Sequence, residues 1–258
     1  MIFTKPDISP LVWQVLKRNL LVFRKTWKVN LTFNFLEPVF YLGALGFGLG
    51  AYVNYMEGIP YLNYLAPGLI ASSAMFASAY ECTYGSFVRM EFQKTYDAIM
   101  ATPASIDDVV MGDMLYGAFK SVLYGTVILI VISMLGLVLS PWALLIPPVL
   151  AVSGLLFAAL SMTWTGLVPN IDSFNYFFSL IITPLFLFSG VFFPIAVMPA
   201  IIQKIAWMSP LYHLVNLTRS LVNGNVGVSL AADFLWLVVV FLIVVPAPFY
   251  FLRRLLVK

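Results

Sequence analysis

Residues 230–252, LAADFLWLVVVFLIVVPAPFYFL, decide the class of fold, because this stretch carries a single charged side chain. About twenty apolar residues let a helix cross the roughly 30 Å of hydrocarbon in a bilayer. The whole chain of 258 residues is 62% hydrophobic and 10% charged, whereas about a quarter of a soluble domain is charged. A soluble fold could not bury so much apolar surface. The sequence therefore predicts an all-α polytopic membrane protein.

Six segments are apolar and long enough to span a membrane, at about 31–52, 63–89, 112–138, 142–168, 174–193 and 230–252. Lys and Arg gather before residue 30, around Arg89 and Lys94, and in the tail from Arg253. Because cytoplasmic flanks carry an excess of Lys and Arg, an even number of spans with both termini inside fits this distribution. We expect one membrane domain over 1–258. The opening MIFTKPDISP predicts no removable signal peptide.

The stretch 11–28, LVWQVLKRNLLVFRKTWK, has the pattern of an amphipathic helix. Its apolar face carries Val12, Leu16, Leu20, Phe23 and Trp27, and its opposite face carries Lys17, Arg18, Arg24, Lys25 and Lys28. Such a helix lies at the interface with the anionic cytoplasmic leaflet, where each cation contributes about 1 kcal/mol. The sequence leaves two interpretations open: a topology anchor alone, or an anchor that also contacts a cytoplasmic partner.

The stretch 194–228 is apolar but is interrupted by Pro194, Pro199 and Pro210. Neither half spans alone, since helices of about ten and fourteen residues rise roughly 15 and 21 Å. A re-entrant helical hairpin between the fifth and sixth spans, dipping into the outer leaflet, keeps the even count and bonds its backbone within protein. An amphipathic pair lying flat on the outer surface is the alternative. Pro210 after Ser209 predicts the start of the second helix.

The sequence holds no ATP-hydrolysing motif. It lacks the G-x-x-x-x-G-K-[ST] phosphate cradle, so we expect no enzyme activity and no cofactor in this chain. The spacing of Gly46 and Gly50 indicates close helix packing and not a dinucleotide site. His213 is the single histidine and has no ligand neighbours at metal spacing, so it indicates a satisfied polar group and no metal centre. Cys82 alone forms no intrachain disulfide.

Ionisable side chains within predicted spans are costly, so we compare the depths of three of them. Glu37, Glu81 and Lys120 share one layer, roughly 9 to 12 Å from the cytoplasmic boundary at 1.5 Å per residue. An unpaired charge at that depth costs several kcal/mol, so we predict that Lys120 pairs with Glu81 or Glu37. Snorkelling of Lys120 toward the cytoplasm is the alternative.

The longest cytoplasmic connection is 90–111, MEFQKTYDAIMATPASIDDVVM. A short helix is expected over about 91–100, before Pro103. Ser105, Asp107 and Asp108 then predict the capped start of the third span. A short helix on the inner face of the membrane can take mechanical input from a soluble subunit. We predict that coupling role, with a plain connecting loop as the alternative.

The order of amphipathic basic helix, six spans and outer hairpin resembles the type 2 ABC exporters, and among them the NodJ-like permeases. The likeness covers nearly the whole chain and implies one permease domain over 1–258 in a bacterial inner membrane. Its most specific pieces are EPVFYLGALGFGLG at 37–50, YLAPGLIASSAMFASAYECTYGSFVRM at 64–90, TYDAIMATP at 95–103, LFLFSGVFFPI at 185–195 and MSPLYHLVNLTRSLVNG at 208–224.

The resemblance implies a homodimer with two copies of a cytoplasmic ATPase, which binds ATP and Mg. It places the coupling helix at 91–101 and the exit pathway along the dimer interface. The residues implied for ATPase coupling are Glu91, Phe92, Thr95, Tyr96, Asp97, Met100, Trp13, Arg24 and Trp27. Those implied for the translocation pathway are Phe35, Tyr41, Tyr80 and Phe188, and those for the outer hairpin are Pro210, Tyr212 and His213.

The NodJ-like members are associated with export of lipo-chitooligosaccharides, and similar permeases move lipid-linked glycans. The resemblance therefore implies an amphiphilic substrate, membrane lipids as surroundings and no nucleic acid partner. A drug or another lipid stays open as the substrate. An ion-driven secondary transporter, with Glu37 and Glu81 carrying protons, is the rival from another class. A non-transporting membrane anchor is a second rival.

Overall fold

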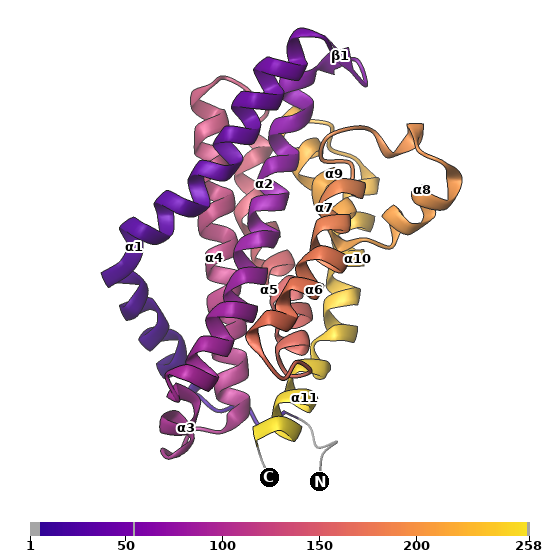
Figure 1. Ribbon diagram of the computed structural model, residues 1–258. Helices are drawn as coiled ribbons and strands as arrows, with labels where there is room; N and C mark the ends of the chain where they lie inside the picture. Colours follow the sequence, from indigo (N-terminus) through magenta and orange to yellow (C-terminus); the bar gives the residue numbers. More distant parts are fainter. Residues whose placement is uncertain (1–5, 54, 257–258) are drawn as a thin grey trace.

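The protein is a mostly helical bundle (Figure 1). The computed structural model describes residues 6–53 and 55–256, apart from the side chains at positions 29, 31–35 and 37. Phe35 and Glu37, which the sequence assigned to the pathway and to the ion pair, therefore lie outside the described side chains. The helices are α1 (Val12–Gly43), α2 (Tyr61–Tyr80), α3 (Thr95–Met100), α4 (Ile106–Met134), α5 (Ile146–Thr165), α6 (Phe174–Phe177), α7 (Thr183–Phe188), α8 (Ala200–Trp207), α9 (Pro210–Asn223), α10 (Val228–Val244) and α11 (Pro246–Leu256).

Shorter elements extend or join these helices. Within residues 6–53 and 55–256, four π-helical turns cover Ala44–Gly48, Glu81–Gly85, Val88–Phe92 and Phe178–Ile182. Short 3-10 turns cover Leu49–Ala51, Pro141–Leu145, Ile171–Ser173 and Ile195–Val197. Strands β1 (Tyr55–Met56) and β2 (Ile59–Pro60) form an antiparallel hairpin between α1 and α2. The sequence did not predict this hairpin, because two-residue strands leave no alternating pattern.

α1 is one continuous helix, whereas the sequence predicted an interfacial helix over 11–28 and a separate span from 31. No Gly or Pro interrupts α1 before Pro38, so nothing breaks its backbone hydrogen bonds where the two parts meet. Its first turns pack on α4, with Val12, Val15 and Asn19 buried. A Cβ added at Gly112 of α4 would lie 2.7 Å from Val15 Cβ, so glycine permits this close crossing.

α2, α4 and α5 form the centre of the bundle (Figure 1). α2 is buried along nearly its whole length, and small polar residues hold it to its neighbours. The Ser78 hydroxyl donates to the Gly154 carbonyl at 2.8 Å, and Ser121 Oγ donates to the Leu150 carbonyl at 3.3 Å. These bonds satisfy hydroxyl groups away from water and tie α5 to α2 and α4.

Four helical stretches in the described part of the chain are long and apolar enough to cross a membrane. They are Ile106–Met134, Pro141–Thr165, Ile171–Phe188 and Val228–Leu256. The stretch Pro38–Ala51 is apolar but shorter. The molecule is thus a membrane protein with several spanning helices, and the count of six stays a prediction.

The predicted outer hairpin contains two helices, α8 and α9. Ser209 caps α9 by accepting from the Tyr212 amide, and the helix begins at Pro210 as the sequence predicted. Gly224 ends α9 in the left-handed conformation, with φ of 82°. The re-entrant depth of this pair remains a prediction.

The N-terminal segment, the start of α4 and α11 are tied together at one end of the molecule (Figure 1). Ser105 and Asp108 form the predicted cap of α4, in a capping box. Asp108 also accepts from the Ser9 amide at 2.7 Å. Asp107 accepts from Arg253 Nε at 2.7 Å and forms an ion pair with the same guanidinium. One pair of acids therefore fixes both ends of the described chain beside α3.

Candidate functional site

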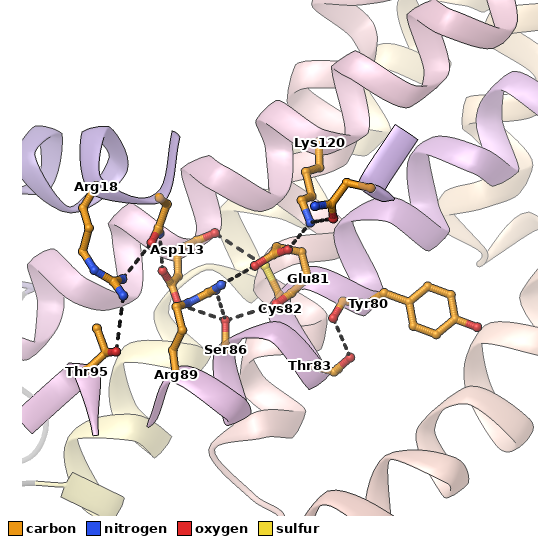
Figure 2. A network of polar contacts seen from close by, with 12 residues as sticks. Arg18, Tyr80, Glu81, Cys82, Thr83, Ser86, Arg89, Thr95, Asp113 and Lys120 are labelled. Atoms are coloured by element: carbon orange, nitrogen blue, oxygen red, sulfur yellow. Dashed lines mark hydrogen bonds and ion pairs between the residues drawn. The ribbon is translucent and has the colours of Figure 1, made fainter. Parts of the chain in front are cut away.

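Four charged side chains meet between α2, α3 and α4, close to α1 (Figure 2). We call Glu81, Arg89, Asp113 and Lys120 the charged network. Asp113 and Lys120 lie on α4, and Glu81 and Arg89 lie on the π-helical turns after α2, each pair about two helical turns apart. Such π-helical turns occur frequently at functional sites.

Asp113 joins four segments of the chain. Its carboxylate is 1% exposed and accepts from Asn19 Nδ2 of α1 at 2.7 Å and from Ser86 Oγ at 3.0 Å. It also accepts from Arg89 Nη2 at 2.9 Å and from the Tyr96 hydroxyl of α3 at 2.6 Å. Four of its five hydrogen bonds reach Oδ2, and the bond from Asn19 reaches Oδ1. Asp113 therefore links α3 to α1, to α4 and to the extension of α2.

Glu81 lies between two cations. One carboxylate oxygen accepts from Arg89 Nη1 and the other from Lys120 Nζ. A Cβ added at Gly85 would lie 2.6 Å from Glu81 Oε1, so the missing side chain leaves room for this carboxylate. The Lys120 ammonium also lies 5.3 Å from the Tyr116 ring centroid. Buried charges persist only with such close partners, since an isolated one costs several kcal/mol.

The sequence analysis found two members of the charged network and missed two. It proposed Lys120 with Glu81 or Glu37, and the structure places the Lys120 ammonium on Glu81. It treated Arg89 as a flanking charge and gave Asp113 no role. The signal was present, because Asp113 shares a face of α4 with Lys120, and Arg89 shares a face with Glu81.

The proposed coupling helix is shorter than the predicted 91–101. Glu91 and Phe92 belong to the preceding π-helical turn and are exposed. Lys94 then takes a left-handed conformation, with φ of 49°, and α3 starts at Thr95. This kink separates α3 from the end of the second predicted span.

Tyr96 is the buried anchor of α3. Burial and the adjacent Asp113 carboxylate raise the pKa of Tyr96 well above its usual range, so the phenol stays protonated and donates its hydrogen bond. Thr95 accepts from Arg18 Nη2 of α1 at 3.3 Å. Asp97 is exposed and Met100 is half-buried. α3 is therefore held on its inner side and open on its outer side.

The predicted coupling residues of α1 are exposed, unlike Tyr96 of α3, which is buried. Trp13 is 61% exposed and Trp27 is 46% exposed, and Arg24 is also exposed. Exposed tryptophans suit a membrane interface or a partner surface. The structure leaves these three side chains available to either.

Aromatic rings form a continuous series between α1, α2 and the helices after residue 174. Tyr80 stacks on Phe178 at 4.4 Å between centroids, and Phe186 lies 5.3 Å from Phe76 and 5.7 Å from Tyr41. Of the predicted pathway residues, Tyr41 and Tyr80 thus share one face. Phe188 instead lines a separate apolar groove of about 350 Å³ between α7 and α8.

His213 joins α9 to α10. Its Nδ1 lies 2.6 Å from Asp233 Oδ1, its Nε2 lies 2.8 Å from the Trp207 carbonyl oxygen, and its ring stacks on Trp236 at 4.1 Å. Both ring nitrogens are thereby satisfied, as the sequence analysis expected of a structural histidine. Tyr212 lies beside it, with ring centroids 5.3 Å apart.

Arg219 forms a clamp that the sequence analysis missed. Its guanidinium donates to the Gly190 carbonyl at 2.7 Å and to the Tyr64 carbonyl at 3.2 Å, and lies 3.7 Å from the Tyr64 ring centroid. It ties α9 to α2 and to the loop after α7. Arg219 had been counted only as an outer flanking charge.

We expect Arg219→Gln to lower the free energy of unfolding by about 2 kcal/mol, because two buried carbonyls lose a charged donor and a cation–π contact is lost. Thermal unfolding of the detergent-solubilised protein measures this. Lys204→Gln, at an exposed position of α8, removes the same charge and should change stability by less than about 0.5 kcal/mol. Equal loss in both variants would contradict the clamp.

Known proteins resemble this chain over most of its length. Residues 10–223 match the ABC-2 type transporter family. Nodulation protein J of Rhizobium leguminosarum bv. viciae is 39% identical over 238 residues, which cover 90% of each chain. Nodulation protein J of Sinorhizobium fredii is 36% identical over 212 residues, covering 82% of this chain and 81% of that protein. Inner membrane transport permease YadH of Escherichia coli is 22% identical over 198 residues, 75% of each chain.

The matched region contains the charged network, α3 and the outer helices α8 and α9. Relatives at this level of identity over more than two thirds of the chain show its family. The chain therefore belongs to the ABC-2 type transporter family and is a membrane transport permease of the Nodulation protein J type.

Proposed function

We propose that this chain is the permease subunit of an ATP-driven exporter, which moves an amphiphile out of the cytoplasm or the inner leaflet. The observation that carries the proposal is the bond from Tyr96 of α3 to Asp113 of α4, at 2.6 Å. The family implies an ATPase partner. We propose two copies of that ATPase on a homodimer of this chain, with ATP and Mg bound by the partner alone.

In this proposal α3 transmits motion from the ATPase to the membrane helices. Its exposed side, with Asp97, faces the partner, and its buried side holds Asp113 through Tyr96 and α1 through the Thr95 bond to Arg18. A displacement of α3 therefore shifts α1, α4 and the π-helical turns together. ATP biases the two states of the permease only if the partner binds α3 differently in each.

We propose the topology that the charge distribution indicates: six spans, both termini in the cytoplasm, and α8 and α9 re-entrant at the outer face. α11 and α3 lie at the same end of the molecule, and Arg253 and Arg254 add cations there (Figure 1). This arrangement satisfies the positive-inside bias.

The aromatic series of Tyr41, Phe76, Tyr80, Phe178 and Phe186 supports an amphiphilic substrate, because rings pack on acyl chains and stack on sugar faces. A lipo-oligosaccharide or lipid-linked glycan is the proposed cargo, because the resemblance to NodJ-like permeases implies it. Two of the relatives described above are Nodulation proteins J. Efflux of a drug or another lipid uses the same apolar surface and is the second candidate.

The charged network disfavours an ion-driven carrier. A proton carrier needs a carboxylate that exchanges its proton during the cycle, whereas Glu81 and Asp113 each accept from cations in ion pairs. Protonating either one would break a buried pair and cost roughly 3 to 5 kcal/mol. Mechanical input through α3 requires no such step.

Tyr96→Phe tests the coupling. We expect normal insertion but about tenfold less amphiphile exported per ATP hydrolysed, because the variant keeps the ring and loses a charge-assisted hydrogen bond. The measurement uses the permease with its co-purified ATPase in nanodiscs and vesicles, with lipo-oligosaccharide as the amphiphile.

Tyr55→Phe is the matched control, since Tyr55 is an exposed tyrosine on the hairpin at the other end of the molecule. It should leave export per ATP unchanged. Coupled export by Tyr96→Phe at the native ratio would refute the coupling path. Export by the purified chain without an ATPase would refute the proposed function.

A further inference from the structure

A cavity of about 390 Å³, lined by several charged and polar side chains, lies beside the charged network. α1, the π-helical turns and α4 line it, and Arg18, Asn30, Glu81, Arg89, Tyr116 and Lys120 are among its walls. Val22, which is 50% exposed, and the exposed Gln93 also border it, so the cavity reaches the protein surface. On the proposed topology it extends from the cytoplasmic interface into the inner leaflet.

The cavity carries an excess of positive charge among the described residues. Arg18, Arg89 and Lys120 contribute three cations, and Glu81 on the wall and Asp113 behind it contribute two carboxylates. Arg89 and Lys120 hold those carboxylates in ion pairs. The hydrogen bonds of Arg18 go instead to neutral acceptors, Asn19 Oδ1 at 3.0 Å and Thr95 Oγ1 at 3.3 Å.

Arg18 is therefore the cation that lacks a carboxylate in hydrogen-bond contact. Burial and the neighbouring Arg89 charge lower the pKa of Arg18, which indicates an environment that a further negative charge would relieve. Three of the five N–H donors of a guanidinium remain beyond those two bonds. Planar guanidinium groups bind phosphate and sulfate oxygens in pairs of parallel bonds.

The surroundings of the cavity favour a ligand that comes from the membrane. Lys17, Arg24, Lys25 and Lys28 are exposed on the same part of α1, and such cations attract anionic lipids at a membrane surface. Asn30 and the Lys120 ammonium lie deeper, about two helical turns beyond the level of Asp113 on α4. A neutral sugar would leave the Arg18 charge uncompensated.

We propose that this cavity binds the phosphate or sulfate ester of an anionic amphiphile headgroup, with Arg18 as its principal ligand. Arg89 and Lys120 offset the charges of the Glu81 and Asp113 carboxylates, so the Arg18 charge stays available to the ligand. The same chemistry is found in bilayer phospholipids and in charged cargo. A loading role for the cavity rests on the proposed function, whereas headgroup binding does not.

Binding to the purified full-length chain in detergent tests the site. The probe is dioctanoyl phosphatidic acid, with dioctanoylglycerol as its neutral counterpart and inorganic phosphate as its chain-free counterpart. We expect Arg18→Gln to weaken phosphatidic acid binding about tenfold or more, as loss of a charge-assisted bond predicts. Lys17→Gln removes the same charge from the adjacent exposed position and should weaken binding less than twofold.

Arg18→Lys guards against a folding defect, because it keeps the charge and should retain more binding than Arg18→Gln. Equal weakening by Lys17→Gln and Arg18→Gln would overturn the site in favour of surface attraction. Equal affinity for dioctanoylglycerol would overturn the headgroup assignment. Binding of inorganic phosphate as tightly as phosphatidic acid would overturn the amphiphile assignment.

Measuring phosphatidic acid export by the ATPase-coupled complex in vesicles identifies the source of the ligand. Export of phosphatidic acid would identify the headgroup site with cargo, and retention of bound phosphatidic acid would identify it with bilayer lipid. If the complex exports no amphiphile with ATP while the chain still binds phosphatidic acid, the proposed function is wrong and the headgroup site stands. If the complex exports with ATP while the chain does not bind phosphatidic acid, the headgroup site is wrong and the proposed function stands.

Discussion

Asp113→Asn is expected to lower the free energy of unfolding by about 3 to 5 kcal/mol, the usual cost of removing one partner from a buried ion pair. Arg89 loses one of its two carboxylate partners and keeps Glu81, and one amide nitrogen of the new side chain replaces an acceptor with a donor. At the Oδ1 position that nitrogen meets the donor of Asn19, and at the Oδ2 position it meets the donors of Ser86 and Tyr96. Chemical or thermal unfolding of the solubilised protein measures the effect.

Asp97→Asn is the matched control for Asp113→Asn, because Asp97 is an exposed carboxylate on α3. It should change stability by less than about 0.5 kcal/mol. Asp113→Glu keeps the charge but lengthens the side chain in a closely packed site, so it should fall between the two. An Asp113→Asn protein as stable as Asp97→Asn would show that Asp113 does not hold the four segments together.

Asp113→Asn should also abolish ATP-driven export in protein that still inserts into the membrane. Asp113 is the point at which α3 meets α1, α4 and the π-helical turns, so its loss frees α3 from all three. Tyr96→Phe removes one of these bonds and leaves the others, and its effect should be smaller. This order of severity distinguishes a joint at Asp113 from a general loss of packing.

Hydrophobic length and charge position made the class of fold predictable. The apolar stretches gave the spanning helices α4, α5 and α10 nearly in place, and Ser105 and Pro210 marked the starts of α4 and α9 through capping and proline geometry. These signals depend only on residues near one another along the chain, so they can be read from the sequence.

Features that depend on tertiary contact were not predictable in the same way. α1 continues through the boundary between interface and span because nothing there breaks the helix, whereas hydropathy suggested two elements. α3 begins later than expected because Lys94 adopts a left-handed conformation that is uncommon for a residue with a side chain.

The candidate site was predictable to the extent that its charges lie inside apolar segments. Lys120 and Glu81 stand out for that reason, and their similar predicted depth in the membrane suggested that they form an ion pair. Asp113 and Arg89 lie nearer the ends of their segments, where a charge is ordinary, so only the helical spacing to Lys120 and Glu81 identifies them. Tyr96 gave no sign of burial, because a tyrosine on a short helix in a cytoplasmic connection is equally suited to solvent.

The pair Glu81 and Lys120 should show strong coupling in a double-mutant cycle. Glu81→Gln removes the carboxylate from two cations and should cost about 3 to 5 kcal/mol of stability. Lys120→Met leaves Glu81 with Arg89 and should cost less, roughly 2 kcal/mol. The double variant should be more stable than the sum of the two losses predicts, by at least about 1 kcal/mol.

The physical reason is that each single change leaves a buried charge without its partner, whereas the double change removes both charges and leaves Arg89 paired with Asp113. Glu81→Gln with Lys94→Met is the control cycle, since Lys94 is exposed and pairs with Glu91 instead. That cycle should be additive within about 0.5 kcal/mol. If Glu81 and Lys120 were equally additive, their contact would contribute nothing to stability, and the charged network would end at Arg89.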